Sequence, residues 1–439
     1  MTLKDIIKEI ITLFHNSPQP HVVERNLELP INLEKIISVI GVRRSGKTYI
    51  LFDTINKLIS KGIAKKNIIY INFEDERLQL TRADLDIVLQ AYRELYPDIK
   101  DNEVWFFFDE IQNVDAWEKF IRRIYDTCSK HVFISGSNAL FLSSDIATSL
   151  RGRSISFEVF PYTFDEYLRH QNIHTSFYLP QNKAKILNAF YTFLSEGGFP
   201  EVVSLSQRYR LDILRNYFYV MLYKDLIERY SISSANVLKY FIERLATNIT
   251  KSFSVNKIYN EMRSHGYKMD KNLLYDLLAY IENIYLAFRV SKFDFSFSKR
   301  NRSDKKVYFI DNGLVNSLVM NFSDDIGKLL ENAVFLFLRH NYGELYSNNI
   351  YFHKASKECD FLIYDRQKIV SAAQVSHHID NQNTLNRETE GLKSALISYN
   401  LDKGLIITSE QELEISDKDF KIEVIPAYKL FLNKKFSIY

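Results

Sequence analysis

The chain has 439 residues, of which 46% are hydrophobic and 25% are charged. This length exceeds the roughly 250 to 300 residues at which a single hydrophobic core stops growing, so we expect two or three domains and exclude a peptide or small module. Lys and Arg number 57 against 54 Asp and Glu, and this formal charge of +3 is too near balance to indicate a polyanion partner for the chain as a whole.

The N-terminal segment has helical apolar spacing but is interrupted by Lys4, Asp5 and Lys8, which is not the pattern of a secretory signal. No stretch reaches the ~18 to 20 apolar residues that cross a membrane, so we expect no membrane partner. The two cysteines, Cys128 and Cys359, exclude a disulfide framework and are typical of a reducing compartment. We therefore expect a cytoplasmic protein.

A short β-branched run at residues 36–40 leads directly into a glycine-rich loop. Residues 41–48 read GVRRSGKT, which matches the P-loop pattern G-x-x-x-x-G-K-[ST], and helical spacing follows up to Gly62. Glycines let the N–H groups of such a loop surround phosphate oxygens, while Lys47 reaches the terminal phosphates and Thr48 binds magnesium. The predicted nucleotide contacts are Gly41, Arg43, Arg44, Ser45, Gly46, Lys47, Thr48 and Tyr49.

An acidic pair follows a second strand-like run, Val-Trp-Phe-Phe-Phe at residues 104–108. The pair is Asp109 and Glu110, and the carboxyl edge of a parallel sheet faces the ligand crevice. We predict that Asp109 holds magnesium through water and that Glu110 polarises an attacking water. Two independent motifs thus indicate nucleotide hydrolysis.

Two further strand-like segments, residues 67–76 and 131–139, complete a βαβαβαβ order that resembles the AAA+ branch of the P-loop ATPases. The resemblance implies ATP with Mg²⁺, and it implies that Asn72 restrains the catalytic Glu110. It also implies that the γ-phosphate is sensed at the polar end of the fourth strand. The sensor candidates are Ser135, Ser137 and Asn138.

Two arginines, Arg151 and Arg153, follow the fourth strand. In a ring-forming ATPase, an arginine at this place can reach the γ-phosphate of a neighbouring copy. Simple solvation is the alternative for these arginines and for the polar strand ends.

The middle of the chain is predicted to be mainly helical. Residues 165–235 have helical spacing broken at residues 197–200, Gly-Gly-Phe-Pro, which must form a turn; the resemblance implies a helical lid, and a plain linker domain is the alternative. Residues 236–320 read as three helices and two strands, in winged-helix order. The loop between the strands carries five cations and one acid. We expect it to contact DNA phosphates, with solvation or protein docking as alternatives. These candidate DNA contacts are Lys299, Arg300, Arg302, Lys305 and Lys306.

The last segment, residues 321–439, resembles the restriction-endonuclease-like fold. That fold uses a helical Glu, a strand Asp and a strand acid separated by one residue from a Lys. The matching positions here are Glu331, Asp360, Gln374 and Ser376. Because an amide is a weak metal ligand and a serine brings no positive charge, we expect a site that no longer cleaves phosphodiesters.

The whole arrangement resembles bacterial and archaeal predicted ATPases with an AAA+ domain and a nuclease-like C-terminal domain of unknown function. Motifs that carry this resemblance include GVRRSGKT, FFFDEIQNV, GGFP, ECDFLI and QVSHH. We predict an α/β protein with a P-loop NTPase (AAA+-type) parallel sheet at residues 1–164, a helical lid at 165–235, a winged-helix-like unit at 236–320 and a restriction-endonuclease-like domain at 321–439.

Three functions remain open from the sequence. The first is an ATPase that couples hydrolysis to binding or remodelling nucleic acid, alone or as a homo-oligomeric ring. The second is a nucleotide-controlled switch or scaffold that acts on a protein partner. The third, an ATP-dependent nuclease, is disfavoured by Gln374 and Ser376.

Overall fold

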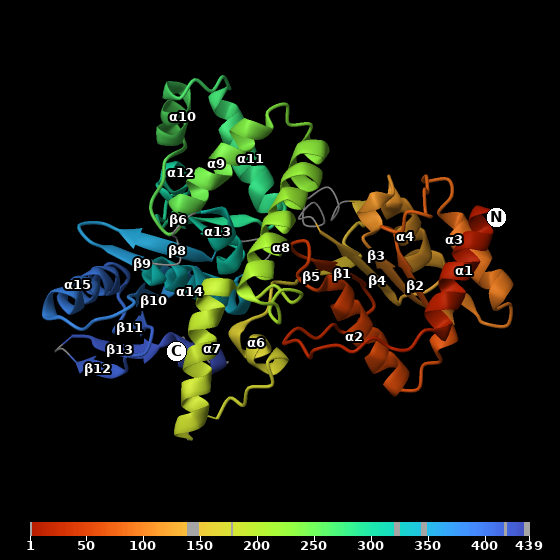
Figure 1. The fold of residues 1–439 in the computed structure, drawn as a ribbon, viewed down its shortest axis with the longest axis horizontal. Coiled ribbons are helices and arrows are strands. Elements are labelled where there is room, and N and C mark those ends of the chain that lie inside the picture. Colours follow the sequence, from red (N-terminus) through yellow and green to blue (C-terminus); the bar gives the residue numbers. More distant parts are fainter. Residues whose placement is uncertain are drawn as a thin grey trace. The chain divides into compact units, whose positions relative to one another are not determined.

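The computed structural model describes residues 2–137, 149–176, 179–319, 325–343, 349–416 and 419–433. The chain forms two compact units, Met1–Phe160 and Pro161–Tyr439 (Figure 1).

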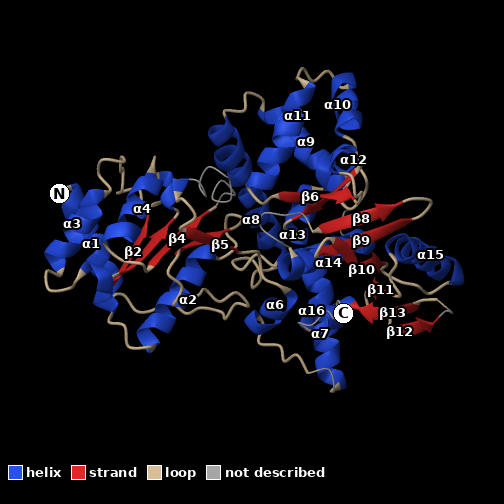
Figure 2. Cartoon of the chain, turned by 180° about the vertical axis from the view of Figure 1, so that it is seen from behind, coloured by secondary structure: helices blue, strands red, loops and turns tan. Residues whose placement is uncertain are grey.

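The first unit is built on a five-stranded parallel sheet in the order β2-β3-β4-β1-β5. Figure 2 shows its strands in red, with helices on either side. Its strands are β1 (Ile36–Ile40), β2 (Ile68–Asn72), β3 (Trp105–Asp109), β4 (Val132–Gly136) and β5 (Ser154–Glu158). Its α-helices are α1 (Leu3–Asn16), α2 (Lys47–Ser60), α3 (Asp86–Leu95) and α4 (Trp117–Thr127). This arrangement confirms the predicted α/β fold and the βαβαβαβ order.

The three central strands β1, β3 and β4 are buried along their whole length. Helices cover a parallel sheet on both faces, so its strands are continuous apolar runs rather than alternating ones. Phe107 of β3 stacks on Phe133 of β4 with ring centroids 4.6 Å apart. This packing holds the carboxyl ends of neighbouring strands in register, which is where the polar residues of the site begin.

The second unit starts with helices, as the spacing of residues 165–235 predicts. They are α6 (Phe164–His170), α7 (Pro180–Glu196), α8 (Gln207–Val220) with a π-helical continuation η5 (Met221–Glu228), α9 (Ala235–Thr247), α10 (Val255–Ser264) and α11 (Lys271–Asn283). The predicted turn after α7 is present, and Gly197 has φ +77° there. The next residue, Gly198, donates its N–H to the carboxylate of Asp311 at 2.7 Å.

An eight-stranded mixed sheet follows, in the order β12-β13-β11-β10-β9-β8-β6-β7. Its strands are β6 (Ala287–Lys292), β7 (Lys305–Phe309), β8 (Ile350–Lys354), β9 (Glu358–Asp365), β10 (Lys368–Val375), β11 (Lys403–Thr408), β12 (Leu413–Ser416) and β13 (Lys421–Pro426). The accompanying helices are α12 (Phe297–Arg302), α13 (Asn312–Leu318), α14 (Ile326–Tyr342), α15 (Gln382–Tyr399) and α16 (Ala427–Leu432).

The predicted hairpin of residues 236–320 is present as the antiparallel pair β6 and β7. However, β6 also pairs in parallel with β8, so the expected winged-helix-like segment and the expected C-terminal domain share one sheet. The connection between the two strands is also different from the expected open loop. It contains the short helix α12, and β7 already begins at Lys305.

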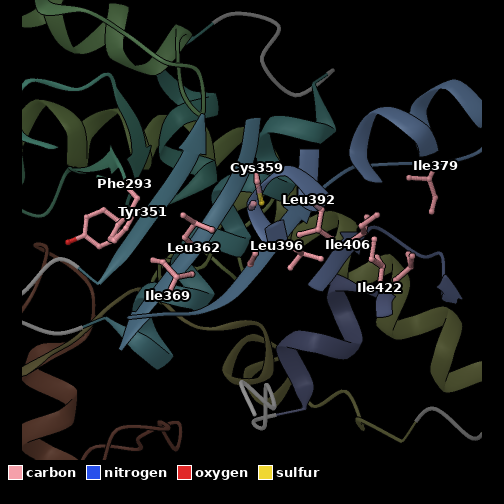
Figure 3. Close-up of a cluster of buried hydrophobic side chains, with 13 residues drawn as sticks. Phe293, Tyr351, Cys359, Leu362, Ile369, Ile379, Leu392, Leu396, Ile406 and Ile422 are labelled. Carbon is pink, nitrogen blue, oxygen red and sulfur yellow. The ribbon is translucent and has the colours of Figure 1, made fainter. Parts of the chain in front are cut away.

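The core of this sheet lies under α15. Leu392 and Leu396 of α15 pack with Leu362 of β9 and Ile406 of β11, and all four side chains are fully buried (Figure 3). On the hairpin side, α14 contacts β7, β8 and β10. Helix α14 therefore places Glu331 near Lys306 of β7, and α15 places Glu388 near Gln374 of β10.

Candidate nucleotide-binding site

The P-loop joins β1 to the first turn of α2 and needs glycine at two places. Gly46 has φ +100°, a left-handed conformation, and α2 begins at the next residue. Gly41 has φ +151°, and a Cβ at this position would lie 2.1 Å from the carbonyl oxygen of Val159. The loop can therefore bend sharply and leave the free N–H groups of the helix N-terminus open to an anion.

Lys47 is the cation of this loop, and it is buried with an exposed fraction of 4%. Its Nζ donates to the carbonyl oxygen of Val42 at 3.1 Å and lies 3.4 Å from Oε1 of Glu110. Beside it, the hydroxyl of Ser45 is buried and makes no hydrogen bond within the described residues. A buried ammonium and an unsatisfied hydroxyl at a helix N-terminus are suited to phosphate oxygens.

Asp109 ends β3 with its carboxylate fully buried. One carboxylate oxygen accepts hydrogen bonds from the hydroxyls of Thr48 at 2.7 Å and Tyr70 at 3.0 Å, and the other accepts from the hydroxyl of Ser135. Burial, together with the neighbouring charge of Glu110, raises the pKa of Asp109 above its ordinary value, although the three hydroxyl donors oppose the rise. The two predicted magnesium ligands, Thr48 and Asp109, are thus in direct contact.

Glu110 lies in a left-handed conformation, with φ +50°. Its N–H donates to Ser135 Oγ at 3.0 Å, and its Oε2 accepts from the side-chain amide of Gln112 at 2.5 Å. Burial alone would raise the pKa of Glu110, but Lys47, Gln112 and Arg43 together hold it below its ordinary value. Glu110 is therefore a carboxylate at neutral pH and fits the part of a base that orients water.

The structure gives the side chain of Asn72 a different partner from the expected Glu110. Its side-chain oxygen accepts the N–H of Glu74 at 2.8 Å, and Glu74 forms an ion pair with Arg43 at 2.6 Å. In this structure Gln112, two residues further along the chain, donates a hydrogen bond to the Glu110 carboxylate. Gln112 lies two residues after Glu110, so its proximity can be read from the sequence. The hydrogen bond from Tyr70 to Asp109 depends on the register of β2 against β3.

The remaining nucleotide-site candidates are placed as follows. Ser137 is buried near Glu110, and Asn138 lies outside the described residues. Tyr49 is 53% exposed. Arg151 is exposed with φ +51°, and Arg153 forms an ion pair with Asp126 of its own chain at 2.8 Å. Arg44 has φ +67° in the P-loop itself.

A P-loop implies a nucleotide with Mg²⁺, and the residues present fit both. Lys47, Ser45 and the start of α2 provide donors for phosphates, and Thr48 with Asp109 provides hard oxygen ligands for a magnesium ion. No helix in the described part of the chain is long and apolar enough to cross a membrane.

The candidates in the second unit separate into two groups. Lys299 and Arg302 are exposed on α12, and Arg300 is partly exposed there. Lys305 instead donates to the carbonyl oxygen of Arg300 at 2.7 Å, and Lys306 is only 2% exposed. Lys306 as a DNA contact was wrong, because its ammonium points into the protein.

The predicted nuclease-like residues are brought together only in part. Glu331 and Asp360 both contact the ammonium of Lys306, and Gln374 accepts the N–H of Asp360 at 3.3 Å. Ser376 donates to the carbonyl oxygen of His378 at 3.0 Å. Lys306 was not predicted as a member of this cluster.

Comparison with known proteins agrees with this geometry. A family model described as an AAA domain matches residues 33–168, and a model described as a domain of unknown function matches residues 187–325. An uncharacterized protein of Methanocaldococcus jannaschii is 35% identical over 424 residues, which cover 94% of this chain and 91% of the relative. An uncharacterized protein of Haemophilus influenzae is 29% identical over 353 residues, covering 79% and 85%.

Among solved structures, Orc1 of Aeropyrum pernix in complex with DNA is 13% identical with a TM-score of 0.28, covering 74% of this chain and 91% of that one. AMPPCP-bound DnaA from Aquifex aeolicus is also 13% identical with a TM-score of 0.28, covering 63% and 86%. The chain belongs to the same family as the Methanocaldococcus jannaschii relative, and its first unit makes it an AAA+ P-loop ATPase by fold.

Proposed function

We propose that the protein binds and hydrolyses ATP and couples hydrolysis to the binding or remodelling of nucleic acid. The observation that supports hydrolysis is the convergence of Lys47, Thr48, Asp109 and Glu110 at the carboxyl ends of β1 and β3. These groups have the chemistry needed to bind a triphosphate, hold its metal and orient a water.

The contacts of Lys47 and Glu110 suggest how binding prepares the base. In the structure these two side chains neutralise each other at 3.4 Å. A triphosphate would compete for the ammonium of Lys47, and Glu110 would then be held by Gln112 and free to accept a hydrogen bond from water. Magnesium held by Thr48 and Asp109 would supply charge neutralisation on the phosphate oxygens.

Two variants test this assignment. Glu110→Gln should retain ATP binding and lose hydrolysis by a factor of about a thousand, because water polarisation is lost while the phosphate contacts remain. Lys47→Ala should lose binding itself. Glu103→Gln, an exposed carboxylate just before β3, is the matched control and should behave like the wild type.

Calorimetric titration with ATP and a phosphate-release assay measure the two properties separately. Normal turnover by Glu110→Gln would refute the role of Glu110. Unchanged ATP affinity of Lys47→Ala would refute the site as a whole.

For nucleic acid, the exposed aromatic rings of the β6–β7 connection are the supporting observation. Phe295 is 76% exposed and Phe297 is 67% exposed. Arg300 lies 5.8 Å from the centre of the Phe297 ring, and Lys299 and Arg302 share the same short helix. Exposed rings that bases can stack on, next to cations for phosphates, favour a single-stranded nucleic acid over a duplex groove.

The double variant Phe295→Ala/Phe297→Ala tests this surface. We expect single-stranded DNA or RNA to stimulate the wild-type ATPase and to have at least about tenfold less effect on the variant, since each stacked base contributes about 1 to 3 kcal/mol. Tyr209→Ala is the control. It removes an aromatic side chain on α8 that is 62% exposed, and nucleic acid should stimulate its ATPase as much as that of the wild type.

Turnover that is indifferent to every nucleic acid would instead favour the nucleotide-controlled switch acting on a protein.

The same ATPase assay, run at increasing protein concentration, tests for a ring. An arginine that acts on a neighbouring copy makes the specific activity rise with concentration. Arg151→Ala and Arg153→Ala should remove that rise.

We still expect a cytoplasmic location, because Cys128 and Cys359 are free cysteines, as is typical of a reducing compartment.

A further inference from the structure

A buried lysine stands at the centre of the nuclease-like cluster. Lys306 lies on β7, and its Nζ is 2.9 Å from Asp360 Oδ1, 2.9 Å from Glu358 Oε1 and 3.2 Å from Glu331 Oε1. An ammonium has three N–H donors, and here it donates hydrogen bonds to Asp360 and Glu331 and forms an ion pair with Glu358. The carboxylates come from α14 and β9, so three elements converge on one cation.

The carboxylates have further partners inside the protein. Asp360 Oδ2 accepts the N–H of Val375 at 3.0 Å, and Glu331 Oε1 also accepts the hydroxyl of Tyr308 at 2.8 Å. These bonds fix the two carboxylates around the ammonium. Breaking one of them would leave a buried polar group without a partner.

Gln374 and Ser376 are also engaged elsewhere. The side-chain amide N–H of Gln374 donates to Glu388 at 2.7 Å, and its oxygen accepts the N–H of Asp360. Ser376 donates to a backbone carbonyl. The strand acid of the nuclease pattern is therefore replaced by a residue bound to a neighbouring carboxylate.

The residues present do not fit the divalent metal that a nuclease-like fold implies. Hard cations need carboxylate oxygens that are free to converge on the ion, and here an ammonium occupies the point of convergence. Within the described part of the chain, no group of three or more His, Cys, Asp or Glu residues is suited to hold a metal ion.

We propose that the Lys306 ammonium is the resident cation of this cluster and stands where a nuclease would hold its divalent ion. The second unit is then complete without metal and does not cleave phosphodiesters. These ion pairs also explain how Lys306 can be buried in β7, next to Val307, Tyr308 and Phe309.

Metal binding by the full-length protein tests the proposal. Free Mn²⁺ is titrated in the absence of nucleotide and followed by its electron paramagnetic resonance signal, so the outcome does not depend on ATP hydrolysis. Four proteins are compared: the wild type, Lys306→Ala, Lys306→Ala/Asp360→Asn, and Lys354→Ala. The last removes a lysine of β8, the strand between β6 and β9, whose side chain is 40% exposed; it serves as the matched control.

We expect Lys306→Ala to bind one more Mn²⁺ per chain than the wild type or Lys354→Ala, and Asp360→Asn to remove that extra ion from the double variant. If Lys306→Ala folds and gains no ion, the ammonium does not stand in a cation site and the proposal fails.

A second comparison does not depend on the folding of Lys306→Ala. The wild type and Asp360→Asn should bind the same amount of Mn²⁺, and neither should cut DNA or RNA with Mg²⁺ or Mn²⁺. A wild-type ion that is lost in Asp360→Asn, or metal-dependent cleavage that is lost in this variant, would overturn the proposal.

Discussion

At the scale of single residues, the position of Glu110 is determined by its neighbours in space as well as in sequence. Its backbone is left-handed, which is uncommon outside glycine, and Ser135 and Gln112 hold it there. Strained backbone at a catalytic position persists only when the surroundings specify it. We therefore treat Gln112 as a positioning residue for Glu110.

Gln112→Ala tests this role through the pH dependence of hydrolysis. Loss of the amide donor should raise the pKa of Glu110, because that hydrogen bond helps to hold it down. Glu110 acts as a carboxylate, so the acidic limb of the kcat profile should move to higher pH, and kcat should fall about tenfold from misplacement of the base. Asn72→Ala is the comparison. It should leave the limb in place, since the Asn72 side-chain oxygen accepts the N–H of Glu74. An unmoved limb in Gln112→Ala would contradict the assignment.

At the scale of elements, the turn between α7 and α8 shows why a sequence signal can be reliable without revealing its cause. The break at Gly197 is evident from the sequence. The structure adds that Gly197, which has a positive φ, is packed against the carboxylate of Asp311. The same carboxylate also accepts the N–H of Leu314 at the start of α13. Burial raises the pKa of Asp311 to about 6, although backbone donors oppose the rise.

Gly197→Ala should destabilise the second unit by about 2 kcal/mol or more. A Cβ there would lie 2.1 Å from an Asp311 oxygen, in addition to the cost of about 1 to 2 kcal/mol for a left-handed non-glycine residue. Gly266→Ala is the matched control, because Gly266 has φ +85° with nothing within 4 Å of the added Cβ. It should carry the conformational cost alone. Denaturant unfolding followed by far-UV circular dichroism measures both, and equal losses would show that the contact with Asp311 is unimportant.

At the scale of the whole molecule, the two units can be observed separately. The chain has two tryptophans, Trp105 on β3 and Trp117 on α4, and both belong to the first unit. Tryptophan fluorescence therefore reports the ATPase unit, whereas circular dichroism reports the helices of both units.

A non-hydrolysable ATP analogue with Mg²⁺, at a hundred times its Kd, should stabilise the fluorescence-detected transition by about 2.7 kcal/mol through mass action. Lys47→Ala should show no such shift. Unfolding of the second unit, which only circular dichroism detects, should keep the same midpoint, since the nucleotide-site residues lie in the first unit. A shift confined to the unfolding of the second unit would place the nucleotide elsewhere.

What the sequence determined by itself are the features carried by local pattern. Apolar runs specify β1, β3 and β4, and the P-loop and the acidic pair specify the candidate nucleotide site, because each motif depends on residues that are adjacent along the chain. The turn at residues 197–200 is of the same kind.

Only the tertiary structure decided the partners that are far apart in sequence. Lys306 reads as part of a basic loop until β6 pairs with β8 and brings its strand neighbour β7 to Asp360, 54 residues away. Tyr70 meets Asp109 for the same reason, through the pairing of β2 with β3. Strand register places side chains on one face or the other, and the free energy that selects a register comes from burial across the whole sheet, which no local window of the sequence contains.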